Sequence, residues 1–413
     1  MNDKNLNETY DVAIIGGGLV GASLACALSP LGLKTVLVEA VAFKAASQPS
    51  YDDRTLALSA SSCRILQGLG VWPRVEQSAT AIREIHVREL NRPGRVIMRP
   101  EELGLDRFGH VVEARVFGQA MLETLPALEN LQFTCPAKVT AIHPGEEFST
   151  VHIDADDGAT ELRARLVVGA DGASSFVRES LGIESERHDY GQTAVICNVT
   201  PEQDHRGRAF ELFTPTGPLA VMPHVNGRCG LIWCVPGEQA DSLLEWPDEE
   251  FMQRANERFG RHLGEFLKLG RRSRYPLRLV RALEDIRPRT VILGNAAHAI
   301  HPIGAQGFNL GLRDVAVLAE VLADDLRSGT ARDCGRNELL RRYSEWRQAD
   351  QSGTIAYSDG LARIYSNPSR LVSAARTAAL LAHAFIPPLR RQLAVRAMGF
   401  RGRIPRLARG ESL

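Results

Sequence analysis

The chain has 413 residues, with 49 Lys and Arg against 49 Asp and Glu, so its formal net charge is zero. A chain without net charge has no overall field that would draw in nucleic acid. Its hydrophobic fraction of 44% and charged fraction of 24% are ordinary for a globular protein. A chain this long exceeds one compact core, so we expect two interleaved domains.

The N-terminus is polar, and no apolar run reaches the length of a membrane span. These features predict a cytoplasmic protein without a signal peptide. Seven cysteines are scattered along the chain and none forms a C-x-x-C pair, which indicates reduced thiols and no metal site.

The first informative motif lies near the N-terminus. Residues 10–15 form a short apolar run that predicts a strand, and residues 16–21 then read GGGLVG, which has the form G-x-G-x-x-G. Helical spacing follows over residues 22–31, and residues 34–38 predict a second strand that ends at Glu39. This strand, turn, helix, strand and acid order is typical of a dinucleotide-binding unit.

Each part of this motif has a physical role. Gly16 permits the tight turn, Gly18 lets a pyrophosphate approach, and Gly21 lets the helix pack closely on the strand. The carboxylate of Glu39 can accept hydrogen bonds from ribose hydroxyls. Because an acid here disfavours a 2′-phosphate, NAD or FAD fits better than NADP.

A second glycine-rich loop lies roughly 280 residues further on. Residues 290–293 predict a buried strand, residues 294–314 read GNAAHAIHPIGAQGFNLGLRD, and residues 310–326 have the periodicity of a long helix. Glycines let main-chain N–H groups approach a ligand, and a helix start directs its positive dipole end at it. Two such loops predict one large dinucleotide held at both ends.

The middle of the chain has a different sequence pattern. Residues 166–169 predict a strand that runs into the turn Asp171-Gly172, without a second G-x-G-x-x-G. Further short apolar runs predict an antiparallel sheet, with two strands inserted earlier in the chain. These predicted strands are residues 82–87, 96–99, 194–199, 210–213, 219–223 and 229–235. Residues 115–128 and 236–270 predict helices.

Three motifs therefore stand in order: the first glycine loop with Glu39, then Asp171-Gly172 with Ser175 and Arg178, then residues 294–314. The set resembles the group A flavoprotein aromatic hydroxylases, which share the para-hydroxybenzoate hydroxylase fold. Residues 52–59, DDRTLALS, and residues 301–311 are similar to signatures of the ubiquinone-biosynthesis hydroxylases. Most of the superfamily has Gly-Asp-Ala at the third motif, and Gly294-Asn295-Ala296 here resembles the 2-octaprenyl-6-methoxyphenol hydroxylases.

The resemblance implies an α/β fold, in which a Rossmann-like FAD-binding domain carries an inserted antiparallel-sheet substrate domain and a helical C-terminus. The expected parts are an FAD-binding domain of residues 1–80, 100–188 and 285–350, a substrate domain of residues 81–99 and 189–284, and a basic helical region of residues 351–413.

The resemblance also implies roles toward FAD. Arg54 would lie near the flavin and pyrophosphate, Asp171 would border the FAD, and Asn295 would bind the ribityl chain. Pro302 to Asn309 would pass beside the isoalloxazine ring, and Gly307 and the residues after it would present N–H groups to its pyrimidine edge.

By resemblance, the expected function is hydroxylation of a polyprenylated phenol in ubiquinone biosynthesis, through a flavin hydroperoxide, with O2 and with NAD(P)H as a transient co-substrate. Other ubiquinone-biosynthesis proteins are expected partners. Two alternatives stay open: a hydroxylase of a small soluble aromatic, and a flavin oxidoreductase of the prenyl-reductase type. No catalytic residue is assigned. His224 and Tyr190 are candidates for the pocket, whereas His298 and His301 are expected to fix the loop.

The C-terminal region has an unusual charge pattern. From Arg363 to Arg409 there are ten arginines and no acid or lysine, interleaved with apolar stretches. One reading is a segment that binds the inner-membrane surface or a lipid-handling partner. The other is a pair of C-terminal helices packed on the core, with the arginines facing water.

Overall fold

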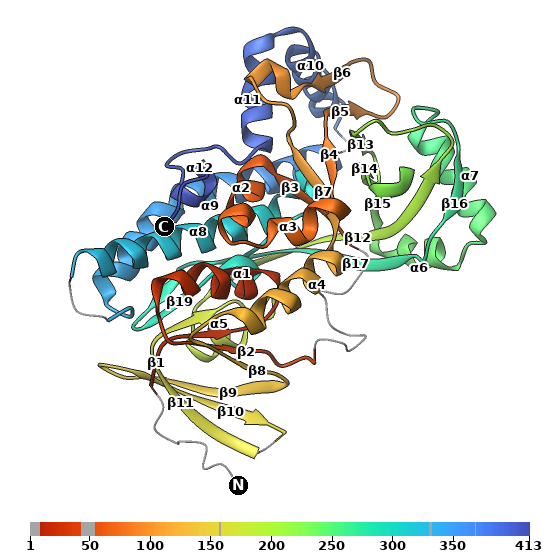
Figure 1. The fold of residues 1–413 in the computed structure, drawn as a ribbon. Helices are drawn as coiled ribbons and strands as arrows, with labels where there is room; N and C mark the ends of the chain where they lie inside the picture. The colour runs from red at the N-terminus through yellow and green to blue at the C-terminus, as the bar shows by residue number, and fades with distance from the viewer. Residues whose placement is uncertain (1–8, 43–53, 157, 330–332, 368) are drawn as a thin grey trace.

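A computed structural model of the protein describes residues 9–42, 54–156, 158–329, 333–367 and 369–413 (Figure 1). Its first layer is an eight-stranded sheet with a parallel centre in the order β19-β11-β1-β2-β8. Where such strands are covered on both faces, their sequences are almost continuously apolar. The bounds are β1 Thr9–Ile15, β2 Thr35–Val38, β8 Leu131–Thr134, β11 Gly158–Gly169 and β19 Thr290–Ile292.

The two faces of this sheet are covered differently (Figure 1). Val12 and Ile14 of β1 pack in one cluster with the helices, whereas Ala13 and Ile15 pack in another with two antiparallel strands. This is the two-residue alternation of a strand buried on both sides. The helices are α1 Leu19–Leu28, α4 Ala114–Thr124 and α8 Gln306–Arg327, and the strands are β9 Ala137–Pro144 and β10 Ser149–Ala155.

A second sheet has nine strands, in the order β20-β17-β12-β15-β14-β13-β5-β6, with β16 beside β12. Its pairings are antiparallel except for β13 with β5. Helices α6 Gly237–Glu245 and α7 Asp248–Phe259 pack on one face through a cluster that includes Phe251 and Phe259. The bounds are β5 Glu84–Glu89, β6 Arg95–Met98, β12 Ser185–Pro201, β13 Arg208–Thr214, β14 Gly217–Pro223, β15 Cys229–Pro236, β16 Phe266–Leu269, β17 Ser273–Ala282 and β20 His298–Ala299.

A small sheet joins these layers. Strand β7, Gly109–Glu113, pairs with β3, Thr55–Ser59, and with β4, Thr80–Ile82. Strand β3 contacts α8 of the first layer, and β4 contacts β14 of the second sheet. The end of β3 therefore lies where the two large sheets approach each other.

The C-terminal region forms four helices that pack on both layers. Helix α9 lies along α8, α10 and α11 contact β6, and α12 contacts α2 and α8. The bounds are α2 Ala60–Gly68, α9 Asn337–Ser366, α10 Arg370–Phe385, α11 Pro387–Ala397 and α12 Arg406–Arg409.

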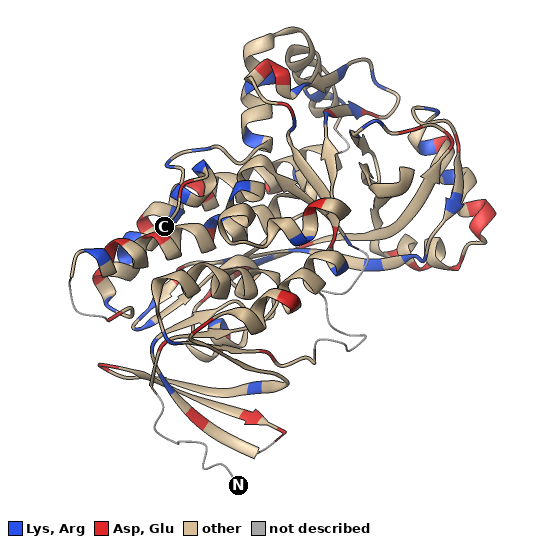
Figure 2. Cartoon of the chain, in the orientation of Figure 1, with Lys and Arg blue, Asp and Glu red and all other residues tan. Residues whose placement is uncertain are grey.

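Half of the arginines in this region are paired with acids, so the charge pattern of the sequence overstates how basic its surface is. Five of the ten form ion pairs: Arg363 with Asp359, Arg376 with Glu89, Arg390 with Glu102, Arg406 with Asp324 and Arg409 with Glu411. Basic and acidic residues are interspersed along the fold (Figure 2). The region is therefore a folded part of the protein, as the second reading proposed.

Most predicted elements are confirmed. Residues 236–270 were expected to form one or two helices, and α6 and α7 are these helices, but the chain then forms strand β16, which pairs with β12. The boundary expected at residue 350 falls inside α9. No proline interrupts the 30 residues of this helix, so it continues across that position.

Candidate functional site

The first glycine loop joins β1 to α1, and its three motif glycines have separate steric reasons. Gly16 has φ +102°, and a Cβ there would lie 2.6 Å from the carbonyl oxygen of Ala170. A Cβ at Gly21 would lie 1.9 Å from the carbonyl oxygen of Gly16. A Cβ at Gly18 would meet no protein atom within 4 Å, and no side chain caps the helix that starts there. Uncapped N–H groups facing open space are what a pyrophosphate requires.

Glu39 holds this loop from within. It is 8% exposed, its Oε2 accepts the Gly17 N–H at 2.6 Å, and its Oε1 accepts the Val41 N–H at 2.7 Å. Each carboxylate oxygen can accept a second hydrogen bond. Glu39 therefore fixes the loop in addition to offering acceptors to a ribose, and the motif spacing alone predicted only the second role.

The Asp171 turn is organised by its own side chains. Asp171 Oδ1 accepts the Ser175 hydroxyl at 2.5 Å, and Oδ2 accepts the Val177 N–H at 3.0 Å. Burial raises the pKa of Asp171 against these hydrogen bonds. The fully buried Arg178 donates to the carbonyl oxygens of Ala173 and Ala296, each at 2.8 Å. Arg178 thus ties the second motif to the third, a link that the sequence did not predict.

The two glycine loops touch each other. Gly294 has φ +59°, and a Cβ there would lie 3.1 Å from Cγ1 of Val20. A Cβ at Gly311 would lie 3.0 Å from Cγ2 of the same valine. Asn295, beside Gly294, is exposed. Loops far apart in the sequence are thus neighbours in space, as a dinucleotide held at both ends requires.

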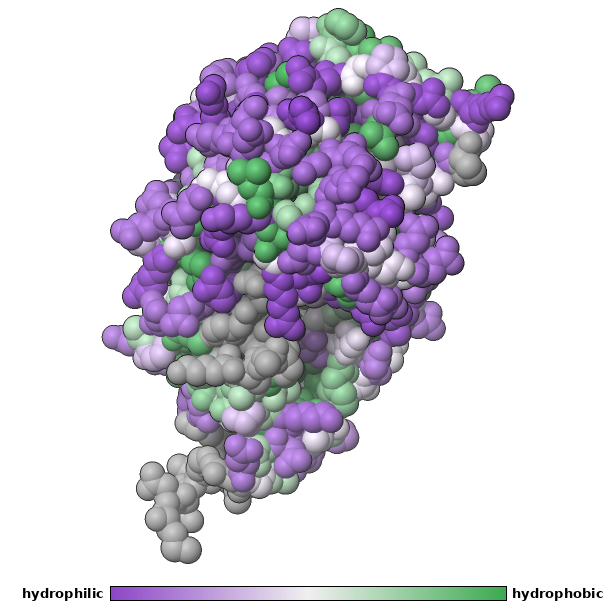
Figure 3. Space-filling view, turned by 90° about the vertical axis from the view of Figure 1, so that its right-hand side faces the viewer, coloured by the Kyte–Doolittle hydropathy of each residue, from purple (hydrophilic) through white to green (hydrophobic). Residues whose placement is uncertain are grey.

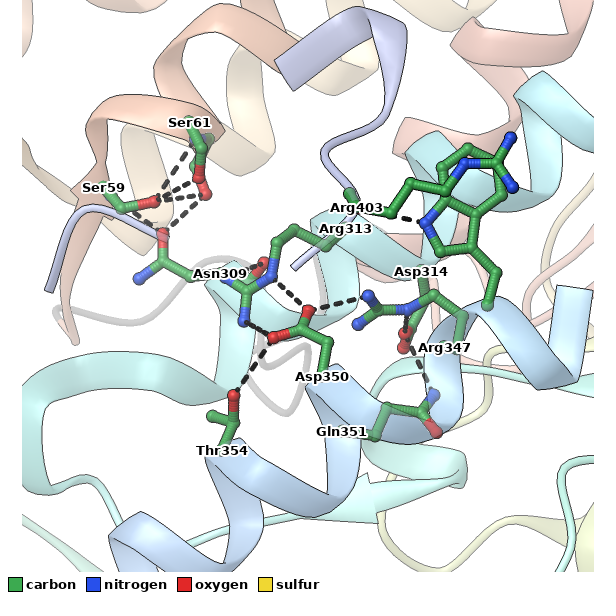
Figure 4. A network of polar contacts seen from close by, with 12 residues as sticks. Ser59, Ser61, Asn309, Arg313, Asp314, Arg347, Asp350, Gln351, Thr354 and Arg403 are labelled. Atoms are coloured by element: carbon green, nitrogen blue, oxygen red, sulfur yellow. Dashed lines mark hydrogen bonds and ion pairs between the residues drawn. The ribbon is translucent and has the colours of Figure 1, made fainter. Parts of the chain in front are cut away.

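A buried carboxylate holds the second loop. Asp314 of α8 is fully buried; its Oδ2 accepts the Gly294 N–H at 3.0 Å and lies 2.6 Å from His298 Nε2. Its Oδ1 accepts Arg347 Nε at 2.7 Å and Gln351 Nε2 at 3.1 Å, both from α9 (Figure 4). One carboxylate therefore joins α8, α9 and the loop.

The network continues through a second acid. Asp350 Oδ2 accepts Arg347 Nη1 at 2.7 Å and Arg313 Nε at 2.7 Å (Figure 4). Burial alone would raise the pKa of Asp314, but His298 and Arg347 hold it far below its usual range. Burial would likewise raise the pKa of Asp350, but Arg313 and Arg347 lower it. Both carboxylates are therefore charged at neutral pH.

Asn309 fastens the start of α8 to the end of β3. Its Oδ1 accepts the Ser59 N–H at 2.8 Å and the Ser62 hydroxyl at 2.7 Å. Its Nδ2 donates to the carbonyl oxygens of Ala57 at 2.8 Å and Ala305 at 2.7 Å. The side chain is committed to these bonds, so what Asn309 can offer a flavin is its place near a helix start, not its amide.

The segment before α8 forms an exposed turn. Pro302 is exposed, Ala305 has φ +52°, and no side chain caps the helix at Gln306. A Cβ at Gly307 would be in ordinary contact with Ile300 at 3.8 Å. The N-terminal end of the 22-residue helix α8, with its positive partial charge, therefore lies at this turn without a side-chain cap.

The turn borders a cavity of about 540 Å³. Its wall is mainly apolar and comes from β3, β5, β6, β13, α9, α10 and α11, with the turn before α8 at one side. Representative lining residues are Ala57, Val87, Met98, Phe213, Ile303 and Leu393. The cavity therefore lies between the second sheet, the small sheet and the C-terminal helices.

Arg54 lies beside the second sheet, with its guanidinium carbon 5.5 Å from the centre of the Tyr275 ring. Asp52 and Asp53, which belong to the same signature, lie outside the described residues. The placement of Arg54 toward a flavin therefore stays a prediction.

The histidines of the second loop fix its path, as expected. His298 binds Asp314, and His301 Nδ1 accepts the Ile303 N–H at 3.3 Å while the His301 carbonyl accepts the Ser358 hydroxyl at 2.9 Å. Burial lowers the pKa of His301 to about 4, so its ring is neutral.

The two pocket candidates lie elsewhere. His224 Nε2 is 3.0 Å from the Thr55 hydroxyl, and Tyr190 donates to Asp359 at 3.0 Å. Burial lowers the pKa of His224 to about 4. Neither side chain is part of the cavity wall. His224 follows the end of β14, and Tyr190 lies in β12 and packs behind Phe213 and Ile303 of the wall.

Comparison with known proteins gives concordant findings. Residues 9–356 match the protein family described as FAD binding domain. The chain is 38% identical to the ubiquinone hydroxylase UbiL of Rhodospirillum rubrum over 410 residues, 98% of this chain and 94% of that protein. It is 32% identical to the 3-demethoxyubiquinol 3-hydroxylase of Escherichia coli over 404 residues, 95% of this chain and 99% of that protein.

Among solved structures, the fold is similar to that of p-nitrophenol 4-monooxygenase PnpA from Pseudomonas putida DLL-E4. The TM-score is 0.77 at 21% identity, over 96% of this chain and 100% of that chain. The expected fold class, a Rossmann-like α/β domain with an inserted sheet and a helical C-terminus, is thereby confirmed.

Gly18→Val should give a folded protein that does not retain FAD. The new side chain would meet no protein atom, but it would fill the space expected for the pyrophosphate. The visible flavin spectrum and the far-ultraviolet circular dichroism measure the two effects separately. Gly21→Val is the matched comparison, because its side chain collides with the Gly16 carbonyl and should impair folding itself. A Gly18→Val protein with a full flavin spectrum would contradict the assignment of this loop.

Asp314→Asn should lower the free energy of unfolding by about 3–5 kcal/mol at neutral pH, because it removes one of the two carboxylates that pair with the buried guanidinium of Arg347. The folded-state pKa of Asp314 is depressed, so its stabilisation is present above about pH 4 and is lost as the pH falls below that value. Urea titrations at several pH values measure the difference. Asp241→Asn, which removes an exposed ion pair, should change stability little. Equal stability of Asp314→Asn and the unsubstituted protein at pH 7 would refute the anchoring role.

Proposed function

The chain belongs to the FAD-binding-domain family and, within it, to the hydroxylases of ubiquinone biosynthesis; from this premise we propose that it hydroxylates the ring of a polyprenylated phenol. FAD is its cofactor, and O2 and NAD(P)H are its co-substrates. When bound, FAD supplies the activation of O2 that no side chain can perform. The protein's own residues bind, orient and shield the reactants.

The described residues suit FAD. Gly18 leaves room for a pyrophosphate at the start of α1, and Glu39 offers carboxylate oxygens at the end of β2. Exposed Asn295 offers an amide oxygen to a ribityl hydroxyl. We propose that Arg54, Asp171, Pro302 and Gly307 border the same cofactor. The uncapped start of α8 favours negative charge on a ring system placed against it.

The size and lining of the cavity carry the proposal for a prenylated substrate. A cavity of roughly 150 Å³ holds one benzene ring, whereas this one measures about 540 Å³. Ile303 and Gly304 lie at the side of the flavin loop, and Val372 and Ala379 of α10 extend the apolar wall beyond it. A ring with an apolar tail fills such a space and keeps water out. A small soluble aromatic would leave most of it empty.

Deletion of the gene from its host should cause a prenylated phenol that lacks one ring hydroxyl to accumulate. Mass spectrometry of the extracted quinone intermediates identifies it. The unsubstituted gene should restore the normal profile, and the gene for Gly18→Val should not, because the variant lacks its cofactor. An unchanged quinone profile would contradict the proposal. A change in the saturation of prenyl chains instead would favour the reductase alternative.

We further propose that the protein meets its substrate at a membrane surface through α10 and the turn into α11. No described helix is both long and apolar enough to cross a bilayer. Leu371 is 83% exposed and Phe385 is 79% exposed, with Ile364 and Ile386 exposed nearby. Figure 3 shows apolar side chains at the upper end of the molecule, where Figure 1 places α10. Other residues of α10 line the cavity, so the patch and the substrate space share one helix.

Binding of this kind depends mainly on apolar burial, because half of the arginines are paired within the fold. Burying a Leu or Phe side chain contributes about 1.5–3 kcal/mol. The remaining exposed cations, such as Arg370 and Arg391, add attraction to anionic lipid that salt screens. Apolar contacts should therefore retain most of the affinity when the ionic strength is raised.

The double substitution of Leu371 and Phe385 by Asp should weaken binding to vesicles of phosphatidylcholine and phosphatidylglycerol by about 100-fold or more. Co-sedimentation at low and high salt measures it. Leu267→Asp is the control, because Leu267 is 57% exposed on β16, away from these helices, and should bind as the unsubstituted protein does. Equal binding of the double variant and the control would show that this patch is not the contact.

A further inference from the structure

One strand places a carboxyl group in the apolar cavity. Ala209, Glu211 and Phe213 alternate along β13, and all three line the cavity wall. Within the described part of the chain, no residue forms a hydrogen bond or ion pair with the Glu211 carboxyl. Asp350 is the other acid of the wall, and Arg313 and Arg347 already hold it. The carboxyl group of Glu211 therefore lines the cavity without a hydrogen-bonding partner among the described residues.

The surroundings of Glu211 favour its neutral form. Burial raises the pKa of Glu211 to about 8. The titratable groups that face it are Tyr357 and Tyr365 of α9 and Cys234 of β15, and burial together with the Glu211 charge raises the pKa of each. The wall also carries Arg376 and His383 of α10 and Arg396 of α11, but burial is the cause of the raised pKa of Glu211. Holding an ionisable group in such a place disfavours folding, so its presence indicates a function.

We propose that Glu211 binds the phenolic hydroxyl of the substrate and accepts its proton while the ring is hydroxylated. This inference rests on the proposed function and assigns it a catalytic residue. Glu211 and the turn before α8 line one cavity, and Phe213, two residues further along β13, packs against Ile303 of that turn. A ring hydrogen-bonded to Glu211 would therefore lie on the side of the cavity that faces the turn. Tyr357 and Tyr365 cannot replace Glu211 as acceptors of the phenol proton, because burial raises their pKa values and both hydroxyls are protonated near pH 8.

The chemistry balances with the co-substrates already named. The phenolic O–H bond breaks, its proton moves to a carboxylate oxygen of Glu211, and the electron pair stays on the phenol oxygen. Conjugation of that pair makes the ring a stronger nucleophile toward electrophilic oxygen. One atom of O2 becomes the new ring hydroxyl and the other leaves as water, while NAD(P)H supplies two electrons. An acceptor with a pKa near the working pH is the most effective in such a transfer.

Glu211→Gln and Glu211→Leu, made in the full-length FAD-loaded protein, test this role on a prenylated phenol. For the unsubstituted enzyme, kcat/KM should rise as the pH increases through about 8, because the carboxyl must be ionised to accept the proton. Glu211→Gln should lose about 100-fold in kcat/KM and should lack this rise. Met222→Leu alters the same wall without a titrating group, so it should change KM while keeping the rise.

Two readouts separate this role from a structural one. The melting temperature of Glu211→Leu should equal or exceed that of the unsubstituted protein, because an unpartnered buried acid is removed. The flavin spectrum should be unchanged in both variants. A Glu211→Gln enzyme with unaltered kcat/KM and pH profile would overturn the proposal, as would a Glu211→Leu protein of lower melting temperature. Failure of the proposed function differs from these outcomes, since the unsubstituted enzyme itself would then form no hydroxylated product.

Discussion

The site depends on one buried carboxylate. Asp314 accepts hydrogen bonds from the Gly294 backbone on one oxygen and from Arg347 on the other, and it also contacts His298. Without it, the loop that carries Asn295 would lose the hydrogen bonds that join Gly294 and His298 to α8 and, through Arg347, to α9. Charges buried to this degree are stable only when every partner is present. This network of hydrogen bonds and ion pairs therefore holds the second glycine loop beside the first within the protein itself.

The elements around the Asp314 network position the cavity. Asn309 ties the start of α8 to the end of β3, so the uncapped helix start lies at the meeting point of the two large sheets. The second sheet supplies one apolar wall of the cavity, and α10 and α11 line the cavity from another side. The same α10 carries Leu371 and Phe385 on the outside. The proposed membrane contact through α10 would thus place an apolar substrate beside its pocket.

Local sequence patterns predicted the parts of the site that local sterics determine. Gly16 and Gly21 are needed because the backbone passes too close for a side chain, and the spacing of strand, turn and helix in the sequence reveals both positions. Partners that are distant in sequence could not be predicted in this way. Arg178 with Ala296 and Asn309 with Ser59 meet only through the tertiary fold. The paired arginines of the C-terminal region illustrate the same limit, since Glu89 and Glu102 lie far away in the sequence. Glu211 left only a faint signal, one acid within the apolar run AFELFT.

The central claim is that this fold uses FAD to insert one atom of O2 into a prenylated phenol. Turnover of the purified enzyme with NAD(P)H under ¹⁸O2, followed by mass spectrometry of the product, tests it most directly. The account predicts one ¹⁸O atom in each hydroxylated product and none when ¹⁸O is supplied in water. A product that takes its oxygen from water, or oxidation of NAD(P)H in the presence of the phenol without any hydroxylated product, would contradict it.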